Sequence, residues 1–511
     1  MRGTPAGLRM SPSDAVGPRR TDRYSAALHA LLEEAERLGV YAIGRVQDVR
    51  ERGFSAANGK LERQTAGQGA GLGVQVFTPD GLCGFAASDR IEPAAARELV
   101  QRAAALARAS APLDPERNRA VFGLAREPTT VWPSRARPLD ATSPAEQAEA
   151  LLAAHGEALG LAEGFAVRSG HAVVDEAWRI VRSDGTDVSF ATPHAFVRHD
   201  FTARSAAEAV SASCAVSGAD AGVLLEPAQF QRLRTRAQRA VERARATLGA
   251  PPVRSGSYRL VIDYALAKGL AHEAFGHAAE TDGAETSILA TGGKLRLGEV
   301  VAPPGVSIVD GPIEGDYAYQ PVSANGIVRQ TVEIIRDGVL ASGLGDLFSA
   351  ERAGAPITGA CRAESFRARP LPRMSNIRIV VRDPLPLPLD FDEVTPEALR
   401  ALLADAGLIA PGEPTLYLSG YRGGQVHPKL GDFVFNCAAI FDLTDGVAAR
   451  KPAAFSGKSL SALRAIVAGV GDLYLDAMGH CGKNGQSVPS SGGSHAFLVL
   501  EPHPEVVIGG E

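Results

Sequence analysis

Two histidines and one glutamate lie close together in the stretch His272-Glu273-Ala274-Phe275-Gly276-His277. The nearest motif with a defined mechanism is H-E-x-x-H, in which two histidines one helical turn apart bind zinc and the glutamate acts as general base. This chain has one more residue between its histidines. Five residues of a regular α-helix turn by about 500°, so the two rings would point about 140° apart.

A π-bulge would remove this divergence, because it absorbs one extra residue in a helical turn. The rings of His272 and His277 would then share one face, and Gly276 in the spacer would let the backbone adjust. The stretch therefore predicts a metal site on a helix, with Glu273 as its base. The plain alternative is two ordinary histidines on a surface or core helix.

A catalytic zinc ion needs a third protein ligand and one open position. We expect that ligand in the glycine-rich run from Gly479 to Gly485, where Cys481 is the first candidate and His480 the reserve. A metal deprotonates a thiol that binds it, and the charge of nearby Lys483 would favour the thiolate. The alternative is a glycine-rich turn that holds a partly buried free thiol.

Further polar residues are candidates for contact with a ligand or a substrate. Glu280 and Asp282 follow the second histidine, and one of them is expected to orient a ligating imidazole through its other ring nitrogen. Their alternative interpretation, as solvated acids at a helix end, stays open. His427, in a glycine-rich run that begins at Gly423, is also a candidate, as are His480 and Lys483.

Composition narrows the class of protein. The 511 residues allow two or three domains, and 53 basic against 58 acidic residues leave a net charge of −5, with no general attraction to nucleic acid or anionic lipid. No apolar run approaches the length of about 18 residues that a membrane-spanning helix needs. Five widely spaced cysteines predict a reducing, cytoplasmic location without a disulfide framework.

The pattern of the chain predicts an α+β protein of two domains. Residues 1–23 are rich in Arg, Pro and Gly and are expected to be a disordered leader. Residues 24–250 are expected to form an N-terminal domain that resembles an α/β sandwich, with helices on a large mixed sheet. Its arginine-rich helix, residues 226–248, is interpreted as a solvated face, because no aromatic residues interleave. Residues 251–511 are expected to form a β-rich, barrel-like domain that holds the metal site.

Several motifs together resemble the TldD/PmbA family of metallopeptidases. They are the stretch 272–277, the run 481–489 (Cys-Gly-Lys-Asn-Gly-Gln-Ser-Val-Pro), the segments 423–426 and 431–433, the strand 71–76, and the run 370–376 (Pro-Leu-Pro-Arg-Met-Ser-Asn). Because the histidine motif is present, the chain is similar to the metal-bearing, TldD-like branch. The resemblance covers nearly the whole chain after residue 23.

The resemblance implies zinc held by His272, His277 and Cys481, with Glu273 as catalytic base. It also implies unfolded or small peptides as substrates, and a homodimer or a heterodimer with a PmbA (TldE)-like subunit. Two departures bear on specificity: residues 322–325 read Val-Ser-Ala-Asn where relatives often carry acids, and His427 stands where relatives often carry Asp.

Three functions stay open at this point. The first is a zinc-dependent peptidase or amide hydrolase. The second is a metal-dependent tailoring enzyme that cleaves a C–N or C–S bond in a natural-product pathway. The third is a non-catalytic partner subunit with a structural metal. The sequence does not decide between zinc and iron.

Overall fold

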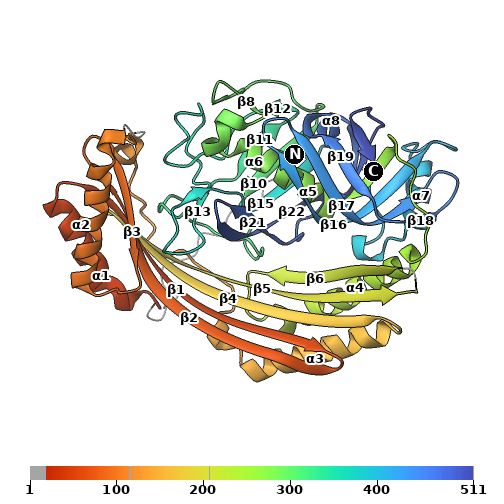
Figure 1. Cartoon of the computed structure of the whole chain (residues 1–511), viewed down its shortest axis with the longest axis horizontal. Helices are drawn as coiled ribbons and strands as arrows, with labels where there is room; N and C mark the ends of the chain where they lie inside the picture. Colours follow the sequence, from red (N-terminus) through yellow and green to blue (C-terminus); the bar gives the residue numbers. More distant parts are fainter. Residues whose placement is uncertain (1–18, 114–116, 207, 510–511) are drawn as a thin grey trace, which may run out of the picture.

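The computed structural model describes residues 19–113, 117–206 and 208–509 and contains two large β-sheets with helices packed against them (Figure 1). This arrangement confirms the predicted α+β class. Residues 1–18 of the expected leader lie outside the described residues. The predicted disorder does not extend to residues 19–23, because Arg20 forms ion pairs with Asp48 (3.1 Å) and Asp175 (3.1 Å) on the first sheet.

The first sheet has six strands in the order β3-β2-β1-β4-β5-β6, and every neighbouring pair is antiparallel. The expected mixed sheet is therefore wrong for this half, because tight hairpins join most successive strands. One of these turns, Asn58-Gly59, has positive φ at both residues (52° and 73°), which suits a two-residue hairpin. The strands are β1 (Tyr41–Ala57), β2 (Lys60–Phe77), β3 (Cys83–Ser88), β4 (Ala166–Arg182), β5 (Asp187–Arg204) and β6 (Ala209–Gly218).

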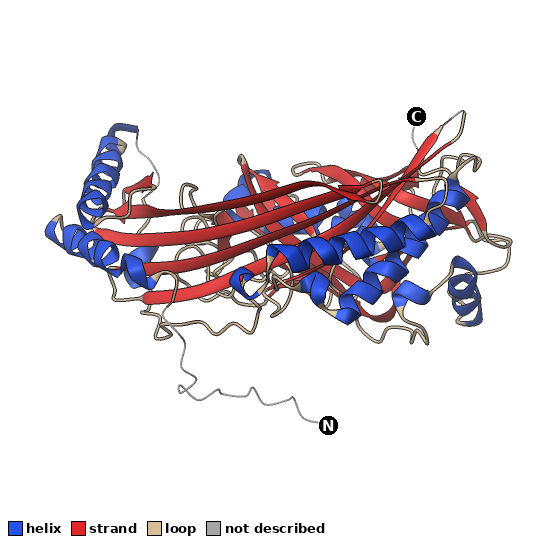
Figure 2. Cartoon of the chain, turned by 90° about the horizontal axis from the view of Figure 1, so that it is seen from below, coloured by secondary structure: helices blue, strands red, loops and turns tan. Residues whose placement is uncertain are grey.

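Four helices pack on this sheet in two pairs (Figures 1 and 2). Helices α1 (Ser25–Arg37) and α2 (Pro93–Ala109) cover one end, and their alanine and leucine side chains share a core with β1 and β2. Helices α3 (Pro144–Leu161) and α4 (Pro227–Thr247) share a second core with β4, β5 and β6. The predicted capping box of Ser143 and Glu146 begins α3. No helix in the described ranges is long and apolar enough to cross a membrane.

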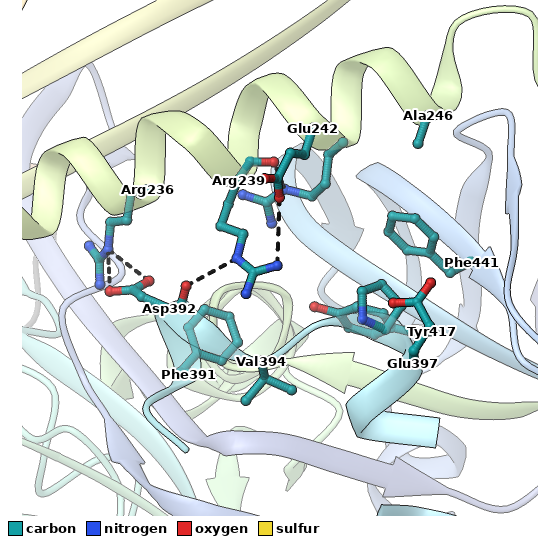
Figure 3. Close-up of a pocket in the computed structure, with 12 residues that line it drawn as sticks. Arg236, Arg239, Glu242, Ala246, Phe391, Asp392, Val394, Glu397, Tyr417 and Phe441 are labelled. Carbon is teal, nitrogen blue, oxygen red and sulfur yellow. Dashed lines mark hydrogen bonds and ion pairs between the residues drawn. The ribbon is translucent and has the colours of Figure 1, made fainter. Parts of the chain in front are cut away.

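Several arginines of α4 face the second half of the chain, which corrects their interpretation as a solvated surface, whereas Arg234 and Arg245 are exposed as expected. Arg232 and Arg236 form ion pairs with Asp392, and Arg236 also reaches Asp476 at 2.9 Å. Arg239 donates a hydrogen bond to the backbone oxygen of Asp392 at 3.2 Å (Figure 3). Charge on this helix therefore joins the two halves of the molecule.

The second sheet has thirteen strands, most of them along the path β12-β11-β10-β15-β22-β7-β16-β17-β19-β23. It is mixed, since β22 runs parallel to β15, and β16 runs parallel to β7. The path ends at two separate edge strands, so the expected barrel does not close within the described residues. The strands are β7 (Arg259–Asp263), β10 (Val306–Gly311), β11 (Val332–Arg336), β12 (Val339–Leu340), β15 (Asn376–Val381), β16 (Thr415–His427), β17 (Asp432–Asp442), β18 (Ala448–Arg450), β19 (Ala454–Lys458), β20 (Ile466–Tyr474), β21 (Gly479–Lys483), β22 (Gln486–Leu500) and β23 (Val506–Ile508). Two short hairpins lie outside it: β8 (Ala290–Thr291) with β9 (Lys294–Leu295), and β13 (Cys361–Arg362) with β14 (Leu371–Pro372).

Alternation along β7 builds a core on each face of this sheet. Leu260 and Ile262 point into the larger core, whereas Val261 points into the other. The larger core encloses α5 (Tyr264–Gly269), the turn that follows it, α6 (His277–Ala279) and α8 (Ser459–Arg464). Helix α7 (Pro396–Asp405) packs on the opposite face. The helix with the histidine motif therefore lies inside the molecule, continuous with the central strand β7.

Candidate metal centre

The histidine motif lies on a π-helical turn, as the spacing predicts. Asp263 ends β7 and caps α5 by accepting a hydrogen bond from the backbone N–H of Leu266 at 2.9 Å. Residues Leu270–Gly276 then form the π-helix before α6 begins at His277. The extra residue is absorbed there, and the rings of His272 and His277 lie 5.1 Å apart between centroids.

Gly276 serves this turn by its small size and not by an unusual backbone angle. Its φ and ψ (−61° and −56°) are those of an ordinary helical residue. A Cβ atom added there would lie 1.8 Å from Sδ of Met374 and 2.9 Å from Cδ1 of Ile377. The expectation that Gly276 lets the backbone adjust is therefore wrong. The absence of a side chain at Gly276 instead lets β15 and the segment before it pack directly against the turn.

Cys481 approaches the histidines from the hairpin of β21 and β22. The turn is Asn484-Gly485, with φ of 49° and 76°, and it sets Cys481 opposite Val488 in the ladder. Sγ of Cys481 lies 3.5 Å from Nε2 of His277, and one donor atom from each of His272, His277 and Cys481 lies within 4.8 Å of the others. Three residues far apart in sequence thus converge, and His480 is not among them.

The donor set suits a metal ion such as zinc. Tetrahedral zinc with ordinary bond lengths places a nitrogen and a sulfur ligand about 3.5 Å apart, which is the spacing of His277 and Cys481. Nδ1 of His272 is buried and has no hydrogen-bond partner among the described residues. Burial holds the pKa of His272 well below its usual range, so the ring is neutral and keeps a lone pair for a metal.

Glu280 fixes the ring of His277. Its Oε2 lies 2.9 Å from Nδ1 of His277, so a carboxylate accepts the proton on that nitrogen and leaves Nε2 toward Cys481. Burial opposes the charge on His277, but the charge of Glu280 and the hydrogen bonds to Cys481 and Glu280 outweigh it and raise the pKa of His277 well above its usual range, so binding of a metal would release a proton from this ring. Glu280 is 1% exposed, so the contact is shielded from solvent.

Lys483 completes this network from the same hairpin as Cys481. Its ammonium donates to Glu280 (2.8 Å) and Asp282 (2.6 Å). Burial works against the charge of Lys483, yet the two carboxylates raise its pKa. The sequence placed Lys483 beside the thiol; in the structure it neutralises the acids that follow the second histidine.

Two other predicted residues lie apart from the cluster. Nε2 of His480 lies 3.1 Å from the hydroxyl of Tyr317. His427 is exposed at the end of β16, where its Nδ1 accepts a hydrogen bond from the backbone N–H of Leu430 at 3.3 Å. Neither residue belongs to the group of donor atoms around Cys481.

Glu273 borders a cavity of about 480 Å³ that lies between β6, α4, β16 and residues 476–480. It forms no hydrogen bond or ion pair within the described part of the chain. Burial raises the pKa of Glu273, while the charges of His277 and Lys268 work in the opposite direction. A half-buried carboxylate beside three potential ligands, open to a cavity, can take up a proton from a molecule bound there.

Sequence reasoning missed Lys268, which lines the same cavity one helical turn before His272. Burial lowers the pKa of the Lys268 ammonium, and the charges of Glu273, Cys481 and Asp316 limit that fall. The signal was available in the spacing, since residues four apart share one face of a helix. Tyr317 was also missed, and no local pattern marks it.

Family models match much of the chain. The PmbA/TldA metallopeptidase domain 1 matches residues 45–107, and the PmbA/TldA metallopeptidase C-terminal domain matches residues 255–493. The second match includes all three residues of the cluster and Glu273.

Similar proteins carry related names. A metalloprotease from Methanothermobacter thermautotrophicus is 33% identical over 51% of this chain and 53% of its own length, and a metalloprotease TldD homolog from Haemophilus influenzae is 31% identical over 54% and 52%. The chain thus spans about half the length of the curated relatives it matches. TldE from Thermococcus kodakarensis shares the fold, with a TM-score of 0.70 and 17% identity over 95% of this chain and all of TldE. Both domain models and the shared fold lead to one conclusion: this chain belongs to the TldD/PmbA family of metallopeptidases.

Proposed function

We propose that this chain is a zinc-dependent peptidase or amide hydrolase that acts on unfolded or small peptides. The observation that carries the proposal is the convergence of His272, His277 and Cys481 beside a carboxylate, Glu273, that faces a cavity. The names of the relatives support the same activity. A site with three protein ligands leaves a fourth position open, as catalytic sites require.

Each residue of the site has a separate role in the proposed hydrolysis. A zinc ion held by His272, His277 and Cys481 would supply a Lewis acid that polarises the scissile carbonyl and lowers the pKa of water. Glu273 takes the proton of the attacking water on its carboxylate and passes it to the leaving nitrogen, so one amide and one water give an acid and an amine. Glu280 holds His277 in the orientation that directs Nε2 inward.

Zinc is the metal we propose in place of iron. Imidazole nitrogen and thiolate sulfur are both ordinary zinc ligands, and catalytic zinc sites have three protein ligands. All five cysteines are free, which supports a reducing, cytoplasmic setting where such a thiol survives.

The partner we propose is a second subunit of the same fold. The likeness to TldE supports a heterodimer of a TldD-like and a TldE-like chain, and a homodimer is the alternative. Size measurement after co-expression with a TldE-like subunit from the same genome distinguishes the two.

Metal analysis and peptide digestion test the proposal. Purified protein is expected to hold one zinc ion per chain and to cleave unstructured peptides. Glu273→Gln is expected to keep the zinc and to slow turnover by about 10²- to 10⁴-fold, the contribution of a general base. Full activity in Glu273→Gln would refute its role as the base. Inertness toward peptides in a zinc-loaded protein, alone and with the partner, would refute the peptidase and favour a tailoring reaction.

A further inference from the structure

Lys268 is a buried cation that has no ion pair with any described residue. It is 6% exposed, and its ammonium donates one long hydrogen bond, to the hydroxyl of Ser490 at 3.3 Å. No carboxylate forms an ion pair with it in the described ranges. A buried charge is costly unless it is paired, so a group that is absent from the protein itself is expected to meet this ammonium.

The ammonium reaches the cavity of the metal centre. Lys268 and Glu273 both line the 480 Å³ cavity, and Gly479 at the start of β21 leaves room for the lysine. A Cβ atom on Gly479 would lie 3.2 Å from Nζ of Lys268. The nitrogen therefore lies over the strand that carries Cys481, on the side where a substrate would enter.

The aspartates around this cavity already have partners. Asp263 accepts hydrogen bonds from the hydroxyl of Ser419 (3.0 Å) and the backbone of Gly420 (2.6 Å). Asp392 and Asp476 pair with arginines of α4. Glu273 alone among the described acids of the lining lacks a partner, and it is the base of the proposed reaction.

Two further cations of the lining contact only neutral oxygens. Nη1 of Arg243 donates to the hydroxyl of Ser419 at 2.7 Å, and Arg422 donates to the backbone oxygen of Ser211. Arg236, which also lines this cavity, differs from these two arginines, because it binds Asp392 through two hydrogen bonds (Figure 3). The cavity beside Glu273 thus contains cationic side chains that are not paired with a carboxylate of the described residues. These charges favour binding of an anionic group.

We propose that Lys268 binds a carboxylate of the substrate next to the scissile amide, so that the site prefers acidic peptides. The carboxylate is either the side chain of Asp or Glu or the free C-terminus of the peptide. This inference rests on the proposed hydrolysis. It makes Lys268 a specificity residue that contacts the substrate.

Matched peptide pairs test the inference in the full, zinc-loaded protein. One pair has the same sequence with a C-terminal acid or amide, and a second pair carries Glu or Gln within an amidated chain. Wild type is expected to cleave one acidic member about 10- to 100-fold faster in kcat/KM, the value of a hydrogen bond to a charged group. The pair that shows the preference identifies the source of the carboxylate.

Variants then assign the preference to Lys268. Lys268→Met is expected to remove the difference in kcat/KM between the acidic peptide and its neutral partner, and Lys268→Arg is expected to keep part of the preference. Lys294→Met, at an exposed lysine of β9, is the control for loss of one positive charge. Zinc content and thermal melting check that each variant is folded, and Lys268→Gln replaces Lys268→Met if that variant fails to fold.

A binding measurement separates this inference from the proposed function. Calorimetry with the Glu273→Gln variant records the affinity for each peptide without turnover, and Lys268→Met in that background is expected to remove the tighter binding of the acid. Equal binding and equal cleavage of both members by wild type would overturn the inference while leaving the hydrolase intact. Tighter binding of acids without any cleavage would support the inference and refute the hydrolase. An equal loss for acidic and neutral peptides in Lys268→Met would show a structural role and overturn it.

Discussion

On one side of the histidine pair the charged groups are paired with each other, and on the other side they face a cavity. Glu280 binds both His277 and Lys483, and Lys483 also binds Asp282. Across the cluster, Glu273 and Lys268 line the 480 Å³ cavity without an ion pair in the described chain. The first side fixes the ring of His277, and under the proposed function the second side contacts the substrate.

This difference gives a ranking of substitutions by their effect on metal binding. Groups on the paired side should change affinity for the ion, whereas groups on the cavity side should change turnover and selectivity. Measurements of zinc affinity and of turnover for each variant therefore test whether the two sides differ in this way.

The largest expected effect is loss of the metal in Cys481→Ser. A serine hydroxyl is a poor zinc ligand beside a thiolate, so affinity should fall by more than about 100-fold, since loss of an orienting partner alone costs about 10- to 100-fold. Competition with a chromogenic chelator measures this change. A chelator should also lower the melting temperature of wild type, because binding energy adds to folding stability, and should leave Cys481→Ser unaffected. Unchanged zinc content in Cys481→Ser would exclude the thiol as a ligand.

A smaller loss is expected for Glu280→Gln. The amide oxygen can still accept a hydrogen bond from His277, but without the negative charge it holds the ring less strongly, so affinity should fall about 10- to 100-fold. The same chelator competition measures it, with Glu273→Gln as the control from the cavity side. A larger loss of zinc in Glu273→Gln than in Glu280→Gln would reverse the comparison.

The arrangement of the two histidines was predictable because it depends on local spacing. The extra residue between His272 and His277 demanded a π-turn, and the structure has one at Leu270–Gly276. Cys481 was a candidate because it sits in a run of glycines, and the structure brings it within 3.5 Å of His277. The π-turn follows from backbone geometry over a few residues, whereas the approach of Cys481 to His277 depends on how distant strands pack.

Contacts between distant parts of the chain could not be predicted from local spacing. Nothing near Gly276 shows that Met374 will press against it, and nothing near Lys483 shows that Glu280 lies beside it. Sheet closure likewise depends on which strands remain at the edges, and β12 and β23 leave this sheet open where a barrel was expected. Tertiary contacts decided each of these points.

Packing at Gly276 gives the third prediction. In Gly276→Ala the new methyl group would overlap Sδ of Met374, so the π-turn or β15 must move. Overpacking of this kind costs about 1–3 kcal/mol of folding stability, and a shift of the turn would also misplace His277. Chemical denaturation of the metal-free protein measures the cost. Gly156→Ala in α3 is the control, because no atom lies within 4 Å of its added Cβ and a helical alanine is expected to be neutral or stabilising.

The smallest effect on zinc affinity is expected for Asp282→Asn. This variant tests whether the paired side acts through the hydrogen bond to His277 or through its total negative charge. Asp282 carries the same charge as Glu280 and binds the same lysine, but only Glu280 touches His277. The side chain of Asp282 is 24% exposed, and a partly exposed ion pair contributes about 0–1 kcal/mol. Zinc affinity should therefore change by less than about fivefold. If Asp282→Asn instead loses as much zinc as Glu280→Gln, the paired side acts through its total charge, and the hydrogen bond to His277 is not what holds the ligand.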